Sequence, residues 1–269
     1  FLARGGTIPL LLYTVFHLGT ATNNISHAAY QKINAHPAVQ WTIPYSFGDS
    51  HRGFRVIGTS EAFYREFRYR QAQSLTFLHG HAPRDVFDVV LGYEVARTLK
   101  YQVGTALVLA HGLSLGSSFL EHKNKPFRVV GILQKTTTPI DRALYIPLEG
   151  MTAMHLDWQE GAPPRSGQEL SADDARKAAL TPDQITAFLL RTKSRIDTLR
   201  LQREINTLAE EPLMAIIPGV ALAELWQGVS YAEDALRIIT FLVLLVGLLG
   251  MLIALSTALN ERRREIAIL

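Results

Sequence analysis

The chain has 269 residues, of which 48% are hydrophobic and 19% charged, and 27 Lys and Arg face 24 Asp and Glu. This composition excludes a disordered chain, and a net charge of +3 argues against a dedicated nucleic-acid binder. The chain has no cysteine, which excludes disulfides, thiolate catalysis and cysteine-based zinc sites.

The first sixty residues predict strands around one helix. The apolar run 8–18 is partly β-branched and aromatic, which predicts a strand. Ser26 is a suitable N-cap for a helix that ends at Ala35. Strands over 39–45 and 54–58 complete a compact strand–helix–strand–strand unit.

The middle of the chain is rich in short apolar segments separated by turn residues, which predicts a β-rich part. Amphipathic patterns predict helices over 60–70 and 93–99. A polar stretch over 157–174, rich in Gly and Pro, predicts a loop. The strands of this part are expected over 86–91, 106–110, 127–133 and 143–146.

The last part of the domain repeats the strand–helix–strand order. A strand is expected over 185–191, a helix over 195–210 that is capped by Ser194, and a strand over 214–217. Two similar units that flank a β-rich insert indicate two subdomains, the first built from both ends of the region. The expected buried stripe of the helix consists of Ile196, Leu199, Ile205 and Leu208.

Residues 238–259 contain no charged side chain and predict a membrane-spanning helix. At about 1.5 Å per residue such a helix is roughly 33 Å long, enough to cross a hydrocarbon core of about 30 Å. Three arginines follow directly at 262–264, whereas acidic residues precede the segment. Because basic residues collect on the cytoplasmic side, residues 1–236 are expected outside the cytoplasm. The alternative is a buried core helix, but such stretches are usually shorter.

Three sequence blocks, in this order, resemble one family. DVVLGYEVARTLKYQVGTALVL (88–109) is similar to the family pattern "vvlg..lA..l...vGd.i.l", and FRVVGIL (127–133) followed by DRALYIPLE (141–149) is similar to "f.VvGil…d..v.ipl". ALNERRREIAIL (258–269) resembles the cytoplasmic "ER..EI..L" segment that follows a membrane helix. Over nearly its whole length, the chain resembles the MacB/FtsX/LolC-type ABC transporter permeases.

The resemblance implies an α+β extracytoplasmic domain of two subdomains. An α/β porter-like subdomain would consist of residues 1–59 and 186–228, with an inserted β-rich subdomain over 60–185. A stalk and transmembrane helix would occupy 229–259, and a cytoplasmic coupling segment 260–269. The family usually has four membrane helices in the inner (cytoplasmic) membrane, so three further helices are expected outside this sequence.

The resemblance also implies a function. The chain would be the permease subunit of an ABC transporter that transmits ATP-driven motion to a periplasmic domain for export or extraction of a substrate, which is mechanotransmission. The sequence has no G-x-x-x-x-G-K-[ST] loop and no G-x-S-x-G motif, so we expect no enzymatic activity in this chain and ATP-Mg in a partner. The expected partners are a cytoplasmic ABC ATPase subunit, a second permease copy, a periplasmic adaptor or substrate-binding protein, and membrane lipid, with no nucleic acid.

Two alternative functions are possible for such a permease. A third alternative is that the chain belongs to a simpler membrane protein. The chain could belong to a metal (zinc)-linked ABC transport system, or regulate an extracytoplasmic enzyme as the FtsX branch does. This third interpretation is a bitopic binding or sensor protein with a single membrane helix. An adjacent ATPase gene and four membrane helices in the full gene would distinguish a transporter from the last of these.

The end of the sequence contains the residues expected to contact the ATPase. Arginine side chains supply hydrogen-bond donors for carboxylates on a partner, and isoleucine supplies an apolar anchor. The same arginines also fix the topology of the membrane helix, and the two roles are compatible. The expected coupling residues are Glu261, Arg262, Arg263, Arg264, Glu265 and Ile266.

Three histidines form a candidate metal site. His111 and His122 bracket the Gly/Ser-rich stretch HGLSLGSSFLEH, where a hairpin would bring them together, and His155 follows later in the chain. Imidazole suits zinc, copper and nickel. The pattern also resembles a subgroup of these permeases for which a link to zinc uptake is suspected. The alternative is a set of surface histidines with no common site.

Two acidic sequences are expected to have structural roles. Asp141 and Arg142 lie in a turn-rich segment, where an ion pair between them is favoured over a substrate contact. Asp173 and Asp174 are expected to mark the solvated start of a helix.

Overall fold

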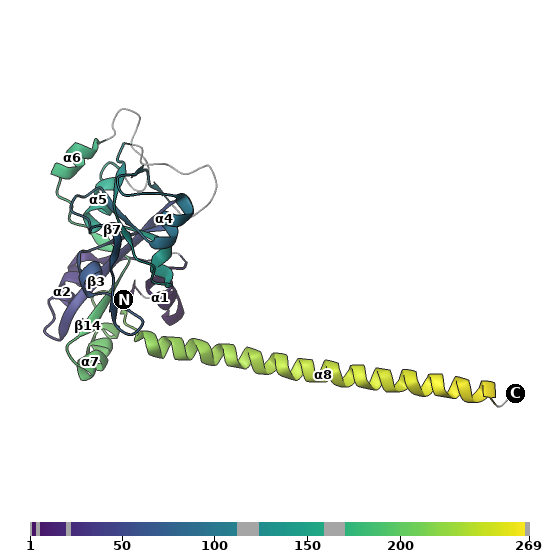
Figure 1. The fold of residues 1–269 in the computed structure, drawn as a ribbon. Helices are drawn as coiled ribbons and strands as arrows, with labels where there is room; N and C mark the ends of the chain where they lie inside the picture. The colour runs from purple at the N-terminus through teal and green to yellow at the C-terminus, as the bar shows by residue number, and fades with distance from the viewer. Residues whose placement is uncertain (1, 4–5, 20–22, 112–123, 159–169, 267–269) are drawn as a thin grey trace. The chain divides into compact units, whose positions relative to one another are not determined.

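The computed structural model describes residues 2–3, 6–19, 23–111, 124–158 and 170–266 (Figure 1). The chain forms two compact units, Phe1–Ile217 and Pro218–Leu269. The first contains all the strands of the described residues, and the second is a long helix. Each unit is described by itself below.

The N-terminal apolar run is a helix, so the strand predicted over 8–18 is wrong. Helix α1 (Thr7–Thr14) buries Leu10 and Leu11. Pro9 is its third residue, a position where the backbone N–H has no helical partner to lose. A continuous apolar run does not distinguish a strand from a buried helix by its periodicity, which explains the error.

Helix α2 (His27–Asn34) begins at the predicted cap. The Ser26 hydroxyl accepts a hydrogen bond from the Ala29 N–H at 3.2 Å, which satisfies one of the free donors of the first turn. The same hydroxyl donates to Glu211 at 2.5 Å. The cap therefore also joins residues that are far apart in the sequence.

One mixed sheet of nine strands organises the described part of this unit. Its order is β10–β3–β4–β12–β8–β11–β7, with β14 also paired to β3 and β9 to β11. The pairs β4–β12 and β8–β11 are parallel, and the others are antiparallel. The strands are β3 (Val39–His51), β4 (Phe54–Thr59), β7 (Phe77–Gly80), β8 (Asp88–Leu91), β9 (Ala106–Leu107), β10 (Ala110–His111), β11 (Phe127–Leu133), β12 (Ala143–Pro147) and β14 (Ala187–Thr192).

Three short strand pairs lie outside this sheet. They join β1 with β15, β2 with β13, and β5 with β6. The strands β3, β4 and β14 come from the ends expected to form one subdomain, and β12, β8, β11 and β7 from the expected insert, yet all belong to one sheet. The subdomain boundaries stay a prediction. The short strands are β1 (Leu2–Ala3), β2 (Ile25–Ser26), β5 (Arg68–Tyr69), β6 (Gln73–Ser74), β13 (Gln184–Ile185) and β15 (Leu213–Met214).

The centre of the sheet is buried on both faces. In β8, Val89 and Leu91 belong to one hydrophobic cluster and Val90 to another, because successive side chains point to opposite faces of a strand. In the second cluster, Tyr145 stacks on Phe63 with ring centroids 4.6 Å apart. A strand buried in this way is apolar at nearly every position.

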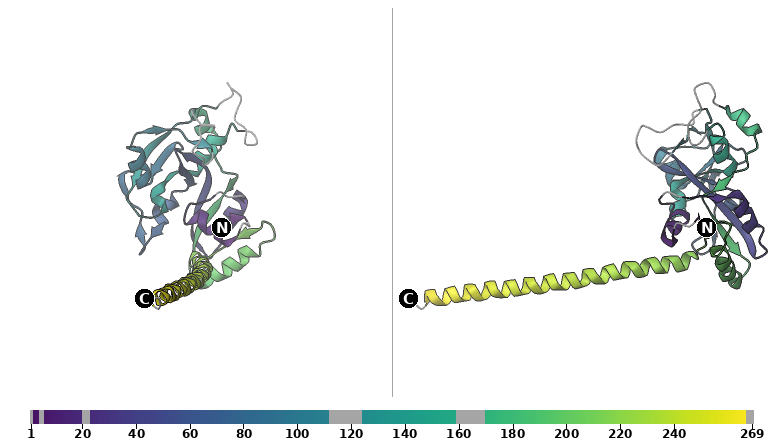
Figure 2. Two further views of the ribbon diagram at one scale, coloured as in Figure 1. Left: turned by 90° about the vertical axis from the view of Figure 1, so that its right-hand side faces the viewer. Right: turned by 180° about the vertical axis from the view of Figure 1, so that it is seen from behind.

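Helices cover the two faces of the sheet. Residues of α4, α5 and α6 pack in the cluster of Val89, and those of α3 and the short helix η1 pack in that of Val90. Figures 1 and 2 show α5 and α6 at one end of this unit and α7 at the other. The helices are α3 (Ala62–Glu66), α4 (Tyr93–Leu99), η1 (Pro139–Arg142), α5 (Leu148–His155), α6 (Ala172–Lys177) and α7 (Arg195–Asn206).

The predictions for the middle of the chain have mixed outcomes. The helix over 93–99 and the strand over 127–133 are confirmed. The helix expected over 60–70 is mostly wrong, because α3 is only five residues long and a hairpin of β5 and β6 follows. The strand expected over 106–110 consists of two short strands on different partners.

Helix α7 has the predicted cap but a different buried face. The Ser194 hydroxyl accepts a hydrogen bond from the Asp197 N–H. Leu201 and Ile205 are buried, whereas Ile196 is 78% and Leu199 64% exposed, so half of the expected stripe is wrong. The helix packs on β14 and β15 through a face that its own sequence does not determine.

Helix α8 (Pro218–Ile266) is continuous over 49 residues. By length and composition alone, its segment Pro218–Leu259 is able to cross a membrane, and none of its most apolar stretch is buried. The helix expected over 238–259 lies within it and is confirmed as a helix. The sequence alone did not indicate that the helix begins as early as Pro218.

Candidate functional site

The predicted coupling residues lie in the last turns of α8. The helical backbone continues without a break from residue 238 to residue 266. Positions 261 and 265 are four apart and therefore on the same side of the helix. The Arg262 side chain is exposed, and the side chains at 261 and 263–266 lie outside the described residues. The coupling role stays a prediction.

Two of the three candidate metal ligands belong to segments that converge on Asp49. The backbone of His111 in β10 lies directly opposite Asp49 in β3. The His155 Nε2 atom, at the end of α5, is 3.7 Å from Asp49 Oδ1. His122 and the side chain of His111 lie outside the described residues. Asp49 was not a sequence candidate, because only the pairing of β3 with β10 identifies it.

A backbone contact sets the tautomer of His155. Its Nδ1 lies 2.9 Å from the carbonyl oxygen of Met151, which can only accept a hydrogen bond. In the neutral ring the proton is therefore on Nδ1, and Nε2 carries the lone pair on the side of Asp49. Within the described ranges, no group of three His, Cys, Asp or Glu is arranged to hold a metal ion.

His51, two residues from Asp49, has a structural environment. Its Nδ1 is 2.7 Å from the carbonyl oxygen of Val108, and its Nε2 is 2.9 Å from the Tyr101 hydroxyl. Because both ring nitrogens have protein partners, this histidine orients the surrounding strands and is not a further ligand candidate.

The two acidic sequences have structural roles, as expected, although one detail differs. Asp141 is buried and accepts hydrogen bonds from the Thr136 and Thr137 N–H groups and from the Thr136 hydroxyl. It makes no ion pair with Arg142 in the described part of the chain. Asp173 and Asp174 lie in the first turn of α6, whose cap is Ser171.

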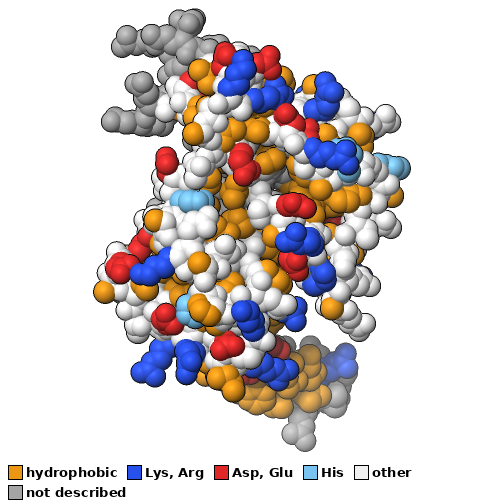
Figure 3. Space-filling model, turned by 90° about the vertical axis from the view of Figure 1, so that its left-hand side faces the viewer, with side chains coloured by type: hydrophobic (Ala, Val, Ile, Leu, Met, Phe, Trp, Pro, Cys, Tyr) orange, Lys and Arg blue, Asp and Glu red, His pale blue; other side chains and the backbone are white. Residues whose placement is uncertain are grey.

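Charges are dispersed over the face drawn in Figure 3. Basic and acidic side chains alternate there, and apolar side chains show between them. The arrangement contrasts with the continuous basic patch that characterises a nucleic-acid interface.

The fold and the long helix together define a class of protein. An α+β domain with a mixed sheet is followed in the chain by a helix of membrane-spanning length. Residues 9–208 match the family model of the MacB-like periplasmic core domain, and the chain belongs to this family. A periplasmic-domain family together with one apolar helix describes a membrane-anchored protein with an extracytoplasmic domain. The family and the α+β class predicted from the sequence are confirmed.

Three solved structures show a distant likeness, and no curated protein matches the chain. The extracellular domain of the noncanonic ABC-type transporter YknZ from Gram-positive bacteria is 8% identical, with a TM-score of 0.41 over 68% of this chain and 83% of that one. The periplasmic region of MacB from Actinobacillus actinomycetemcomitans is 13% identical, with a TM-score of 0.40 over 68% and 74%. A domain of a putative permease protein from Porphyromonas gingivalis is 11% identical, with a TM-score of 0.36 over 70% and 76%.

Proposed function

We propose that the chain is part of a permease subunit that transmits ATP-driven motion of a cytoplasmic ATPase to the extracytoplasmic domain. The supporting observation is the continuity of α8, which begins four residues after β15 and ends beyond the arginine cluster. A helix of 49 residues is roughly 70 Å long, and residues 219–266 contain no proline that would kink it. Packed elements move as rigid bodies, so displacement at one end of the helix reaches the other.

The proposal assigns a position to each part of the chain. Residues 1–236 lie outside the cytoplasm, residues 238–259 contact lipid in the inner membrane, and residues 260–269 contact the ATPase. ATP hydrolysis takes place in that separate subunit. A second permease copy completes the complex, and a periplasmic adaptor or substrate-binding protein contacts the external domain.

Replacing Glu265 with lysine tests the coupling. We expect stimulation of the ATPase by the full-length protein to fall by about tenfold or more, because a reversed charge removes a polar contact and repels the partner's basic groups. The measurement is the rate of ATP hydrolysis by the reconstituted complex, together with co-purification of the ATPase. Glu224→Lys, the same change near the other end of α8, is the control and leaves stimulation intact. Unchanged stimulation in Glu265→Lys would remove the coupling proposal.

A second candidate function is zinc-linked transport, which is favoured by the convergence of the His111 and His155 segments on Asp49. In this proposal, His111, His122 and His155 bind zinc, with Asp49 beside them. A carboxylate next to imidazole nitrogens is a common zinc environment.

Calorimetric titration of the full-length protein with zinc tests this second function. We expect a saturable binding heat in the wild-type protein and about tenfold or more weaker binding in His155→Gln, which removes one ligand. His79→Gln, at an exposed histidine in β7, is the matched control and retains the wild-type affinity. The absence of heat with zinc would remove this function and leave the coupling proposal standing.

A further inference from the structure

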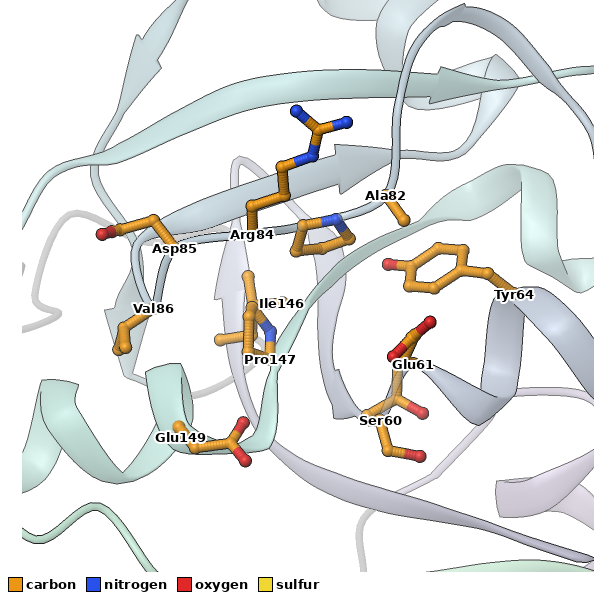
Figure 4. A pocket seen from close by; sticks show the side chains of 12 residues that line it. Ser60, Glu61, Tyr64, Ala82, Arg84, Asp85, Val86, Ile146, Pro147 and Glu149 are labelled. Atoms are coloured by element: carbon orange, nitrogen blue, oxygen red, sulfur yellow. The ribbon is translucent and has the colours of Figure 1, made fainter.

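A pocket of about 320 Å³ lies where the ends of β4 and β12 meet the connection between β7 and β8 (Figure 4). Its volume is at the lower end of the range for small-molecule sites. Apolar side chains form much of its wall, among them Val86, Ile146 and Pro147. The pocket is distinct from the residues around Asp49.

Two carboxylates from different elements line this pocket. Glu61 directly precedes α3, and Glu149 lies in the first turn of α5. Both residues are exposed, and neither carboxylate makes an ion pair or hydrogen bond with the described parts of the chain. Figure 4 shows both side chains reaching into the pocket. Two unpaired negative charges in one concave site attract a cation.

The remaining charged groups around the pocket do not neutralise this pair. Asp85 is bound by Arg176, with the Nε and Oδ2 atoms 3.0 Å apart. Arg84 is exposed, and Figure 4 shows its guanidinium directed away from both glutamates. Arg65 is paired with its neighbour Glu66 at 2.8 Å and also attracts Glu61, so this one cation is shared between two carboxylates and leaves the site negative.

A buried hydroxyl without a partner points into the same pocket. The Tyr64 Oη atom has no hydrogen-bond partner within the described ranges, although the atom is buried. Its ring is fixed against Phe63 and Phe77, with centroid distances of 5.2 and 5.7 Å. Leaving a buried hydroxyl without a hydrogen bond costs free energy. A ligand that donates a hydrogen bond to this oxygen therefore gains more binding free energy than it would from a hydrogen bond to a solvated group.

The wall that carries Glu149 is closely packed. A Cβ atom on the neighbouring Gly150 would lie 2.4 Å from the carbonyl oxygen of Val86, so the first turn of α5 is in close contact with the β7–β8 connection. A pocket whose walls are packed in this way is preformed, which lowers the entropic cost of binding.

From these contacts, we infer that the pocket binds an organic cation with an aliphatic stem. The ammonium group lies between Glu61 and Glu149 and donates one hydrogen bond to the Tyr64 hydroxyl. The stem packs on Ile146 and Pro147. A metal ion fits less well, because the third acidic residue, Asp85, is bound by Arg176, and no group of three ligands is arranged to hold a metal in the described residues. An anion is repelled by the two carboxylates, and Glu149 already offsets the positive end of α5.

The same chemistry has two sources, a free amine and the lysine side chain of a polypeptide. Calorimetric titration of the full-length protein in non-ionic detergent with 1,5-diaminopentane tests the first. Titration with the acetylated, amidated tripeptide Gly-Lys-Gly tests the second, and its norleucine analogue supplies the same stem without the charge. Binding of either cationic probe supports the inference and identifies the source. It is overturned if neither binds, or if the norleucine peptide binds as tightly as the lysine peptide.

Variants connect the binding to these side chains. Glu61→Gln and Glu149→Gln are each expected to weaken binding by about tenfold or more, because hydrogen bonds to charged groups are the stronger ones. Glu94→Gln, at a half-buried carboxylate on α4 that is paired with Arg97 and does not line the pocket, is the control and binds as the wild type does. Equal binding by wild type and the Glu61→Gln, Glu149→Gln double variant would overturn the assignment.

Tyr64→Phe separates a ligand contact from a structural role. If the hydroxyl serves the ligand, the variant binds the probe several-fold more weakly and its apparent Tm does not fall. A lower Tm with unchanged affinity would overturn the role of this hydroxyl.

Discussion

Replacing Lys125 with methionine is expected to destabilise the domain by about 3–5 kcal/mol at neutral pH, because it leaves a buried carboxylate without its partner. Lys125 is fully buried, and its Nζ lies 2.5 Å from Asp157 Oδ1 and 3.1 Å from the carbonyl oxygen of Met154. The Asp157 side chain is only 6% exposed and also accepts the N–H of Leu170. In a protein of this size, the loss corresponds to a fall in apparent Tm of roughly 10 °C.

The effect is expected to depend on pH. Burial alone would raise the pKa of the Asp157 carboxyl, but Lys125 and the N–H of Leu170 hold that pKa below its ordinary value. A carboxyl with a depressed folded-state pKa stabilises the protein above its unfolded value near 3.8 and ceases to do so as the pH falls through the folded-state pKa. The difference in Tm between wild type and Lys125→Met is therefore largest at neutral pH and shrinks in acid.

Two controls make this measurement specific. Lys177→Met removes an exposed lysine from α6 and leaves the Tm within about 1 °C of the wild type, as exposed substitutions usually do. The double variant Lys125→Met, Asp157→Leu removes both charges and recovers much of the loss, since a buried apolar pair replaces the ion pair. A single variant as stable as the wild type at pH 7 would contradict the proposed role of this pair.

Features set by neighbouring residues were predicted well from the sequence. Ser26 and Ser194 were identified as caps because a cap depends only on a hydroxyl and the N–H groups two or three residues later. The apolar stretch within α8 was evident for a similar reason, since length and composition suffice.

Features set by distant residues were not predictable in this way. The buried face of α7 depends on its contacts with β14 and β15, so Ile196 and Leu199 were assigned to the core although they are exposed. Likewise, β4 and β12 are separated by more than eighty residues, and no local sequence pattern indicates that they pair. Intrinsic secondary-structure propensity has little weight where tertiary contacts determine the structure.

The candidate sites follow the same division. His111 and His155 were found from residue type alone, whereas Asp49 required the register of β3 with β10. Glu61 and Glu149 were not candidates either, because nothing in the sequence distinguishes them from ordinary surface glutamates. Only the tertiary structure places both of them around one pocket.

Replacing Gly92 with alanine is expected to destabilise the domain by about 3 kcal/mol. Gly92 directly follows β8 and directly precedes α4. A Cβ atom there would lie 2.4 Å from the carbonyl oxygen of Ile140 and 2.6 Å from that of Asp141. The φ angle of −65° is ordinary, so the requirement for glycine is one of space and not of backbone conformation.

The clash at Gly92 is with backbone atoms of η1, which cannot move aside as the end of a flexible side chain can. The Gly92 N–H donates to the carbonyl oxygen of Ala143 at 2.9 Å, and η1 is held by the hydrogen bonds of the buried Asp141 carboxylate. Inserting the methyl group must either separate α4 from η1 or break these bonds.

Gly48→Ala in β3 is the matched control, since a Cβ atom added at Gly48 would have no neighbour within 4 Å. We expect apparent Tm values, followed by tryptophan fluorescence, to fall by roughly 6–12 °C for Gly92→Ala and to stay near wild type for Gly48→Ala. Equal Tm values for both variants would mean that η1 yields to α4, and that the close approach at Gly92 does not hold the two elements together.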